Sequence, residues 1–310
     1  MRNVRHPIRR AARALAPAVV LLLLYAGLIG CTEELTPRDH FEQPFSVFGV
    51  LSPDLDTQSV RVYPLENFPT LGTAEALEDI VVTSTDRETG EHRTWQGSVV
   101  VEENGQHEFL FEAPFRAAYD RRYLVEVQRR SDGARSFAEV RIPPRATVRI
   151  AGEARGKLDV RIEGDGIQAL TPEVEYFVRA VNFEVEPGIL IPIAYRLAYK
   201  RQQVEGGGQV KIDMVADRWR LQGLYYADTH AMLGVRCRAL AVLDMSIHAL
   251  VGDSVWNPPD GVFDPNVLAR PGTLQNVQNG FGFIGGGYRI HEQLRPSREV
   301  VEEACLYYTW

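Results

Sequence analysis

The sequence predicts an all-β protein of two β-sandwich-like domains, the first immunoglobulin-like, behind a cleaved lipoprotein signal peptide. Three observations lead to this prediction. Short runs of alternating apolar and polar residues recur from residue 45 onward, turn residues separate these runs, and a basic, apolar leader ends in a cysteine. Alternation with a period of two is typical of half-buried strands, and many short strands with regular turns are typical of sandwiches.

The leader occupies residues 1–30. Five arginines precede an apolar run over residues 14–29, and the first acidic residue is Glu33. The run is short for a membrane span, which needs about 20 apolar residues, so we expect a signal peptide that is removed. It ends in a sequence that resembles a bacterial lipobox: Leu28, Ile29, Gly30 and Cys31. We therefore expect acyl chains on Cys31 to anchor the protein to a membrane. The alternative is an uncleaved anchor helix with a chance cysteine.

Residues 31–44 are polar and predict a lipidated tether. Loss of the leader removes five arginines and no acidic residue, so the net charge falls from −7 to about −12. An acidic body argues against nucleic acid as a partner and against electrostatic docking on anionic lipid.

The first domain is expected over residues 45–143. Its predicted strands are 45–51, 58–62, 80–84, 98–102, 108–112, 123–128 and 137–142, each alternating or rich in β-branched residues. Turn residues such as Ser52-Pro53-Asp54 and Ser131-Asp132-Gly133 separate them. A tyrosine within 118–123, just before a strand, is expected to pack at a sandwich corner.

The second, mainly-β domain is expected over residues 144–310. Pro143 and Pro144 mark the boundary, because neither can donate to a sheet ladder. Predicted strands are 147–150, 158–163, 173–183, 189–199, 210–215 and 236–247, with a glycine-rich hairpin turn at 205–209. Short helices are expected near 246–254 and 297–304, the latter with a serine before several acidic residues.

A glycine-rich segment over residues 276–287 contains Gly280, Gly282 and Gly285 in a GxGxxG spacing. A dinucleotide site needs these glycines between a strand and a helix. Here Phe281 and Phe283 fill the gaps and a strand continues at 288–290, so we expect glycines that admit a neighbouring backbone or packed rings.

Two cysteines remain after lipidation, Cys237 and Cys305. In an oxidising, exported compartment they can form a disulfide, whereas two buried free thiols are the alternative. No metal site is expected, because CxxC and HExxH are absent and the histidines are scattered singly along the chain.

The candidate ligand-contact loop contains Trp256, Asp260 and Asp264, because loops carry binding residues more often than strands. Its carboxylates lack the spacing of an EF-hand. Aromatic residues that could stack on a sugar or peptide, or simply fill a core, are Trp95, Trp219, Trp256, Tyr225 and Tyr226. No GxSxG or other catalytic motif is present, so we expect neither an enzyme nor a cofactor.

The lipobox cysteine, the acidic tether, a first strand ending in Gly49-Val50-Leu51-Ser52-Pro53-Asp54 and the late segment 276–283 together resemble a known but uncharacterised family. It is a family of Bacteroidota-type outer-membrane lipoproteins, often encoded beside TonB-dependent receptors. The motifs of this family are structural, so the resemblance assigns a functional role to Cys31 only, as the lipidated residue. This chain departs from the family pattern at residues 289–310.

The resemblance implies a protein that is lipid-anchored in the outer membrane and can be exposed at the cell surface. It also implies a TonB-dependent receptor as partner. We expect a non-enzymatic binding or accessory module. The alternatives are a structural or adhesion lipoprotein and a surface hydrolase of unrecognised type.

Overall fold

The structure is a computed structural model that describes residues 43–65, 74–101, 107–181, 191–204, 207–230, 233, 237–253, 255–256 and 275–310. All of these residues belong to one compact unit, 42–310. Most of them lie in strands, which confirms the predicted all-β, sandwich-like class. The signal peptide, the lipobox and the tether lie outside the described residues, apart from the last two residues of the tether.

The first sandwich has the strand order of an immunoglobulin fold. One sheet contains β1, β2, β6 and β5 in that order, and the other contains β4, β3, β7 and β8. With the strands lettered along the chain, these are the sheets A-B-E-D and C′-C-F-G. The bounds are β1 Phe45–Leu51, β2 Gln58–Pro64, β3 Ile80–Asp86, β4 His92–Thr94, β5 Gln96–Val101, β6 His107–Ala113, β7 Arg122–Arg129 and β8 Arg135–Arg141. The short helix α2, Ala74–Glu78, precedes β3.

A tyrosine corner closes this sandwich. Tyr123, near the start of β7, is buried, and its hydroxyl accepts a hydrogen bond from the backbone N–H of Ala118 (2.9 Å). A tyrosine in this position, bonded to the backbone a few residues upstream, is characteristic of immunoglobulin-like sandwiches. The other tyrosine in the segment, Tyr119, packs edge-on against Tyr288 instead.

The second sandwich also has two sheets. One has the order β13, β14, β10, β9, and the other has the order β12, β11, β15, β16, with β17 beside β15. A single hydrophobic cluster joins Val160 of the first sheet to Tyr176 of the second, and it includes residues of α3 and α5. The bounds are β9 Thr147–Ala154, β10 Lys157–Glu163, β11 Ile167–Ala180, β12 Ile193–Ala198, β13 Arg201–Val204, β14 Gly207–Asp213, α3 Met214–Thr229, β15 Leu240–Asp253, β16 Phe281–Gln293, α5 Arg298–Glu303 and β17 Tyr307–Tyr308.

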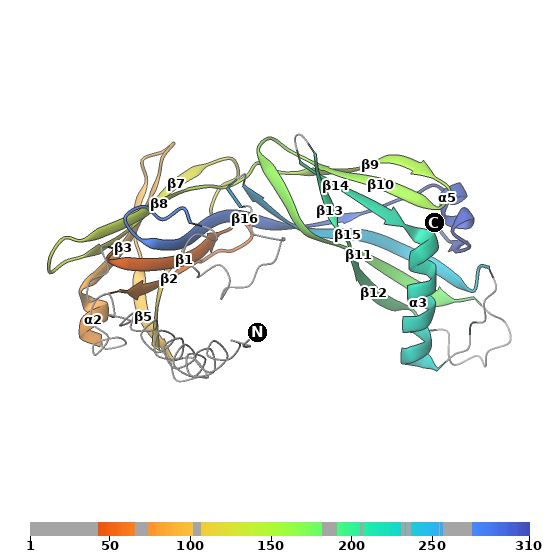
Figure 1. Cartoon of the computed structure of the whole chain (residues 1–310), viewed down its shortest axis with the longest axis horizontal. Coiled ribbons are helices and arrows are strands. Elements are labelled where there is room, and N and C mark those ends of the chain that lie inside the picture. Colours follow the sequence, from red (N-terminus) through yellow and green to blue (C-terminus); the bar gives the residue numbers. More distant parts are fainter. Residues whose placement is uncertain are drawn as a thin grey trace, which may run out of the picture. The chain divides into compact units, whose positions relative to one another are not determined.

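Strand β16 belongs to both sandwiches and joins one sheet of each into a single nine-stranded sheet. Its first half pairs in parallel with β1, from Ser46 opposite Phe281, and its second half pairs antiparallel with β15, as far as Ser246 opposite Gln293. The strand runs from beside β1 to beside β15 (Figure 1). Ile284 accordingly lies in the first hydrophobic cluster and Ile290 in the second.

The glycine-rich segment forms this shared strand. A Cβ atom on Gly286 would lie 2.0 Å from the carbonyl oxygen of Arg141, and one on Gly282 would lie 2.1 Å from that of Val47. The glycines therefore admit a neighbouring backbone, as predicted, and they lie within a strand that continues to Gln293, whereas a dinucleotide site requires a helix to begin at the glycines.

The helices differ in part from expectation. The helix predicted near 246–254 is wrong: β15 extends through this segment to Asp253, because its residues are buried on both faces between β11 and β16. Ser297 caps α5 by accepting from the N–H of Val300, which confirms the second predicted helix. Helix α3 was not expected; it follows β14 directly, with Asp213 as its N-cap. No helix in the described part of the chain is long and apolar enough to cross a membrane.

The expected boundary at Pro143 and Pro144 lies between the two hydrophobic clusters and stays a prediction. The link itself is bound to β16. The hydroxyl of Tyr288 donates to the carbonyl of Pro144 (2.7 Å) and accepts from the N–H of Ala146 (2.5 Å).

Candidate functional site

Trp256, from the predicted contact loop, is a core residue. It is 2% exposed and packs in a small cluster with Leu170 and Phe283. A Cβ on Gly287 would lie 2.2 Å from its ring, so the missing side chain on β16 makes room for the indole. Trp256 therefore takes the core position that the sequence also allows, and ligand contact by the loop stays a prediction. Asp260 and Asp264 lie outside the described residues, as do Cys31 and the lipobox residues Leu28, Ile29 and Gly30.

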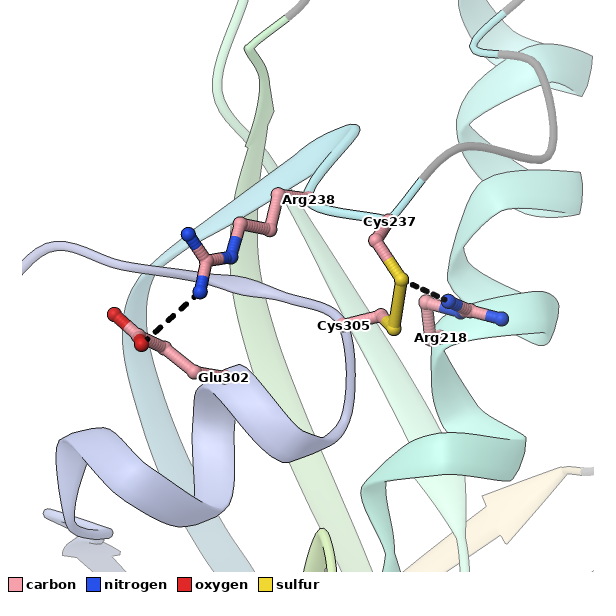
Figure 2. Close-up of a disulfide and its surroundings, with 5 residues drawn as sticks. All are labelled: Arg218, Cys237, Arg238, Glu302 and Cys305. Atoms are coloured by element: carbon pink, nitrogen blue, oxygen red, sulfur yellow. Dashed lines mark hydrogen bonds and ion pairs between the residues drawn. A yellow bond between two sulfur atoms is a disulfide. The ribbon is translucent and has the colours of Figure 1, made fainter.

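A disulfide joins Cys237 to Cys305, with 4.6 Å between their Cα atoms (Figure 2). Cys237 lies in the turn before β15, and Cys305 lies just after α5. Two further contacts hold these segments together: the N–H of Arg238 donates to the carbonyl of Cys305 (2.7 Å), and its guanidinium pairs with Glu302 (3.1 Å). Cys237 is exposed and Cys305 is partly exposed, so solvent reaches the bridge.

Helix α3 directs Arg218 at this disulfide (Figure 2). Arg218 is 7% exposed, and its Nη1 lies 3.8 Å from Sγ of Cys237. Its guanidinium carbon also lies 4.1 Å from the centre of the Trp219 ring. Arg218 makes no ion pair with a carboxylate among the described residues, and its buried Nε has no hydrogen-bond partner there.

A buried carboxylate fixes the orientation of α3. Asp217 accepts hydrogen bonds from the hydroxyls of Tyr176 (2.7 Å) and Tyr199, and Arg220 lies 3.6 Å away. Burial raises the pKa of Asp217, although the hydrogen bond from Tyr176 and the charge of Arg220 partly offset this rise. With Asp217 held inside, Leu221 faces the core.

The opposite side of α3 carries two exposed aromatic residues. Trp219 is 49% exposed and Tyr226 is 48% exposed, and their seven-residue spacing puts them on one side of the helix. Gly223 lies between them, and nothing is within 4 Å of where its Cβ would be. We call Trp219, Gly223 and Tyr226 the α3 aromatic face. Large rings with a polar edge are enriched at protein interfaces.

The structure thus separates the five aromatic residues suggested by the sequence. Trp95, Trp256 and Tyr225 are buried, so only Trp219 and Tyr226 can meet a partner. Composition does not distinguish these groups. The sequence signal that distinguishes them is helical spacing, and it is hard to detect because α3 follows a strand without an intervening loop.

Two histidines that are far apart along the chain lie together in the structure. The rings of His248 on β15 and His291 on β16 stack, with centroids 4.2 Å apart and planes 19° from parallel. Burial lowers the pKa of His248, and the charges of Arg196 and His291 lower it further. Cross-strand pairing brings the two rings together, and sequence alone does not reveal that register.

A serine and a carboxylate also lie beside His248, but they do not form a catalytic triad. Oγ of Ser246 is 3.3 Å from Nε2 of His248, and Oε2 of Glu175 is 3.7 Å from the same nitrogen. A triad needs the hydroxyl and the carboxylate on opposite ring nitrogens. Within the described residues, no group of three His, Cys, Asp or Glu side chains could hold a metal ion.

No protein-family model matches this chain, and no curated protein matches it.

Proposed function

We propose that this chain is an outer-membrane-anchored lipoprotein that acts as a non-enzymatic binding or accessory module for a TonB-dependent transporter. The lipobox ending in Cys31 and the resemblance to outer-membrane lipoproteins support the location. The Cys237–Cys305 disulfide supports an exported, oxidising compartment, because disulfides persist there and are rare in the cytosol.

The observation that carries the binding role is the α3 aromatic face. Trp219 and Tyr226 are each about half exposed on a helix whose orientation Asp217 fixes. Interface energy concentrates in a few aromatic and arginine side chains, and a fixed aromatic pair loses little conformational entropy when it binds. A protein surface of a transporter is therefore the proposed partner of this face.

Lipidation is tested by growing cells with an alkyne-tagged palmitate and detecting the label on the purified full-length protein. We expect label on the wild type and none on Cys31→Ser, because only the thiol of Cys31 accepts diacylglycerol. Cys237→Ser is the matched control and should keep the label. Label on the Cys31→Ser variant would contradict the anchor.

Partner binding is tested by purifying tagged full-length protein from gently solubilised outer membranes. We expect a stoichiometric transporter with the wild type and at least roughly tenfold less with the Trp219→Ala/Tyr226→Ala double variant, since losing two interface aromatics costs on the order of 2 kcal/mol or more. Tyr307→Ala, at another exposed aromatic residue, is the control and should retain the partner. Recovery of the wild type alone would favour the structural or adhesion alternative.

A further inference from the structure

We propose that the Cys237–Cys305 disulfide is a thiol–disulfide exchange site, in which an external dithiol attacks Sγ of Cys305 and Cys237 leaves as a thiolate stabilised by Arg218. This inference does not depend on the proposed transporter partner, because it rests on the surroundings of the two sulfur atoms.

The bridge is accessible. Cys237 is exposed and Cys305 is partly exposed, whereas the apolar residues that flank the bridge, Ala239, Ala304 and Leu306, are buried. Exchange requires an incoming thiolate to reach a sulfur, and exposed disulfides are the labile ones. Access alone does not choose between the two sulfurs.

The charges around the bridge make that choice. Arg218 contacts Sγ of Cys237, and it is buried without a carboxylate partner among the described residues. The other nearby cation, Arg238, is already paired with Glu302. A buried cation without a counter-ion is costly, and a thiolate on Cys237 would supply the missing negative charge. Arginine beside a cysteine stabilises its thiolate, and a better-stabilised thiolate leaves faster.

The exchange balances in two steps. A thiolate of the dithiol attacks Sγ of Cys305, the bond between the two cysteine sulfurs breaks, and its electron pair leaves on Sγ of Cys237. The second thiol of the reductant loses its proton and attacks the mixed disulfide, which releases the Cys305 thiolate. The protein disulfide is thereby reduced by two electrons, the dithiol is oxidised to a disulfide, and each protein thiolate not held by a cation takes up a proton.

Contacts that do not involve sulfur also favour re-formation of the disulfide after reduction. The bond from the N–H of Arg238 to the carbonyl of Cys305 and the pairing of Arg238 with Glu302 do not involve sulfur. The indole of Trp310 further ties the C-terminal segment to β15 through the carbonyl of Leu243 (2.8 Å). These contacts hold the two cysteines near each other after reduction, so an oxidant restores the bridge in a folded protein.

The role of Arg218 is tested by equilibrating the full-length, detergent-solubilised protein with graded ratios of reduced to oxidised dithiothreitol. Free thiols are then trapped by alkylation and counted by mass spectrometry. At a fixed ratio of reduced to oxidised dithiothreitol, we expect Arg218→Gln to lower the ratio of reduced to oxidised protein roughly tenfold. The reason is that one charge-assisted contact to the Cys237 thiolate is lost. Arg218→Lys, which keeps the positive charge, should stay close to the wild type. Arg238→Gln is the matched control and should change the ratio less than about twofold.

The direction of attack is tested on the wild type, so it does not depend on whether a variant folds. Glutathione, a monothiol, stops the reaction at the mixed disulfide, and peptide mapping locates the adduct. We expect glutathione on Cys305 and a free thiol at Cys237. An adduct chiefly on Cys237, a bridge that reacts only in denaturant, or an Arg218→Gln variant that matches the wild type would overturn the proposal.

Discussion

The side-chain amide of Gln58 is buried at the start of β2 and makes four hydrogen bonds. Its oxygen accepts from the N–H of Ser52, and its nitrogen donates to the carbonyls of Ser52, Leu55 and Phe115. The sequence predicts the turn that begins at Ser52 from its serine, proline and aspartate. It does not predict the amide that holds the turn, because glutamine is usually a surface residue.

Asp253, at the end of β15, is a second buried polar residue, and it makes stability depend on pH. Burial raises its pKa to about 6, although backbone donors such as the N–H of Val255 partly offset the effect. In the unfolded chain the carboxyl ionises with its ordinary pKa of 3.8. The protonated form is therefore favoured by folding, and its contribution to stability is complete below about pH 4 and lost as the pH rises through 6.

We expect Asp253→Asn to remove this dependence. Between pH 4 and pH 7 the wild type should lose roughly 3 kcal/mol of unfolding free energy that the variant does not lose, since the pKa difference is about two units. Urea denaturation of both proteins across this range measures the difference. Parallel pH profiles for the two proteins would contradict the prediction.

At the scale of single elements, alternation predicts most strands of both sandwiches, although β11 begins at Ile167 where residue 173 is expected and β15 ends at Asp253 where residue 247 is expected. It fails where burial is two-sided. β15 lies between β11 and β16 and is buried on both faces near its end, so its apolar residues run together and look helical. The opposite error occurs at α3, which begins at Met214, although the alternating pattern predicts a strand that continues to residue 215.

A glycine in β16 and a glycine in α3 should respond in opposite ways to substitution by alanine. We expect Gly286→Ala in β16 to lower the unfolding free energy by about 3 kcal/mol or more, because the new methyl group would collide with the carbonyl of Arg141. Gly223→Ala in α3 is the control and should raise it by about 0.5–1 kcal/mol, since alanine favours the helix and the site is open. Both values come from urea denaturation, and a neutral Gly286→Ala would contradict the shared-strand packing.

At the scale of the whole molecule, the contacts between segments that are separated in the sequence are the ones that the sequence does not predict. The parallel pairing of β1 with β16, the stacking of His248 on His291 and the approach of Arg218 to Cys237 all join distant segments. Composition and spacing report only local periodicity, so they predict the class of fold and the two cysteines as candidates but not these neighbours. The exposed aromatic residues likewise become distinct from buried ones only once α3 is oriented by Asp217.

The disulfide joins residues with a sequence separation of 68, so its loss should lower the stability of the whole fold. We expect the Cys237→Ser/Cys305→Ser double variant to lower the unfolding free energy by about 2–4 kcal/mol, because the unfolded chain regains the entropy that the bridge removes. Wild type unfolded in excess dithiothreitol should show a similar loss. Equal stability of the oxidised wild type and the variant would contradict this expectation.

The sharing of β16 also sets the order in which the molecule can be completed. Synthesis and export both deliver the chain from its N-terminus, so β1 to β8 are present before residue 281, and at that stage β1 has β2 on one side and no neighbour on the other. An unpaired strand edge is a template for pairing with other chains. The sandwich that is synthesised first therefore lacks its last strand until β16 arrives, and the chain must be kept from self-association until then.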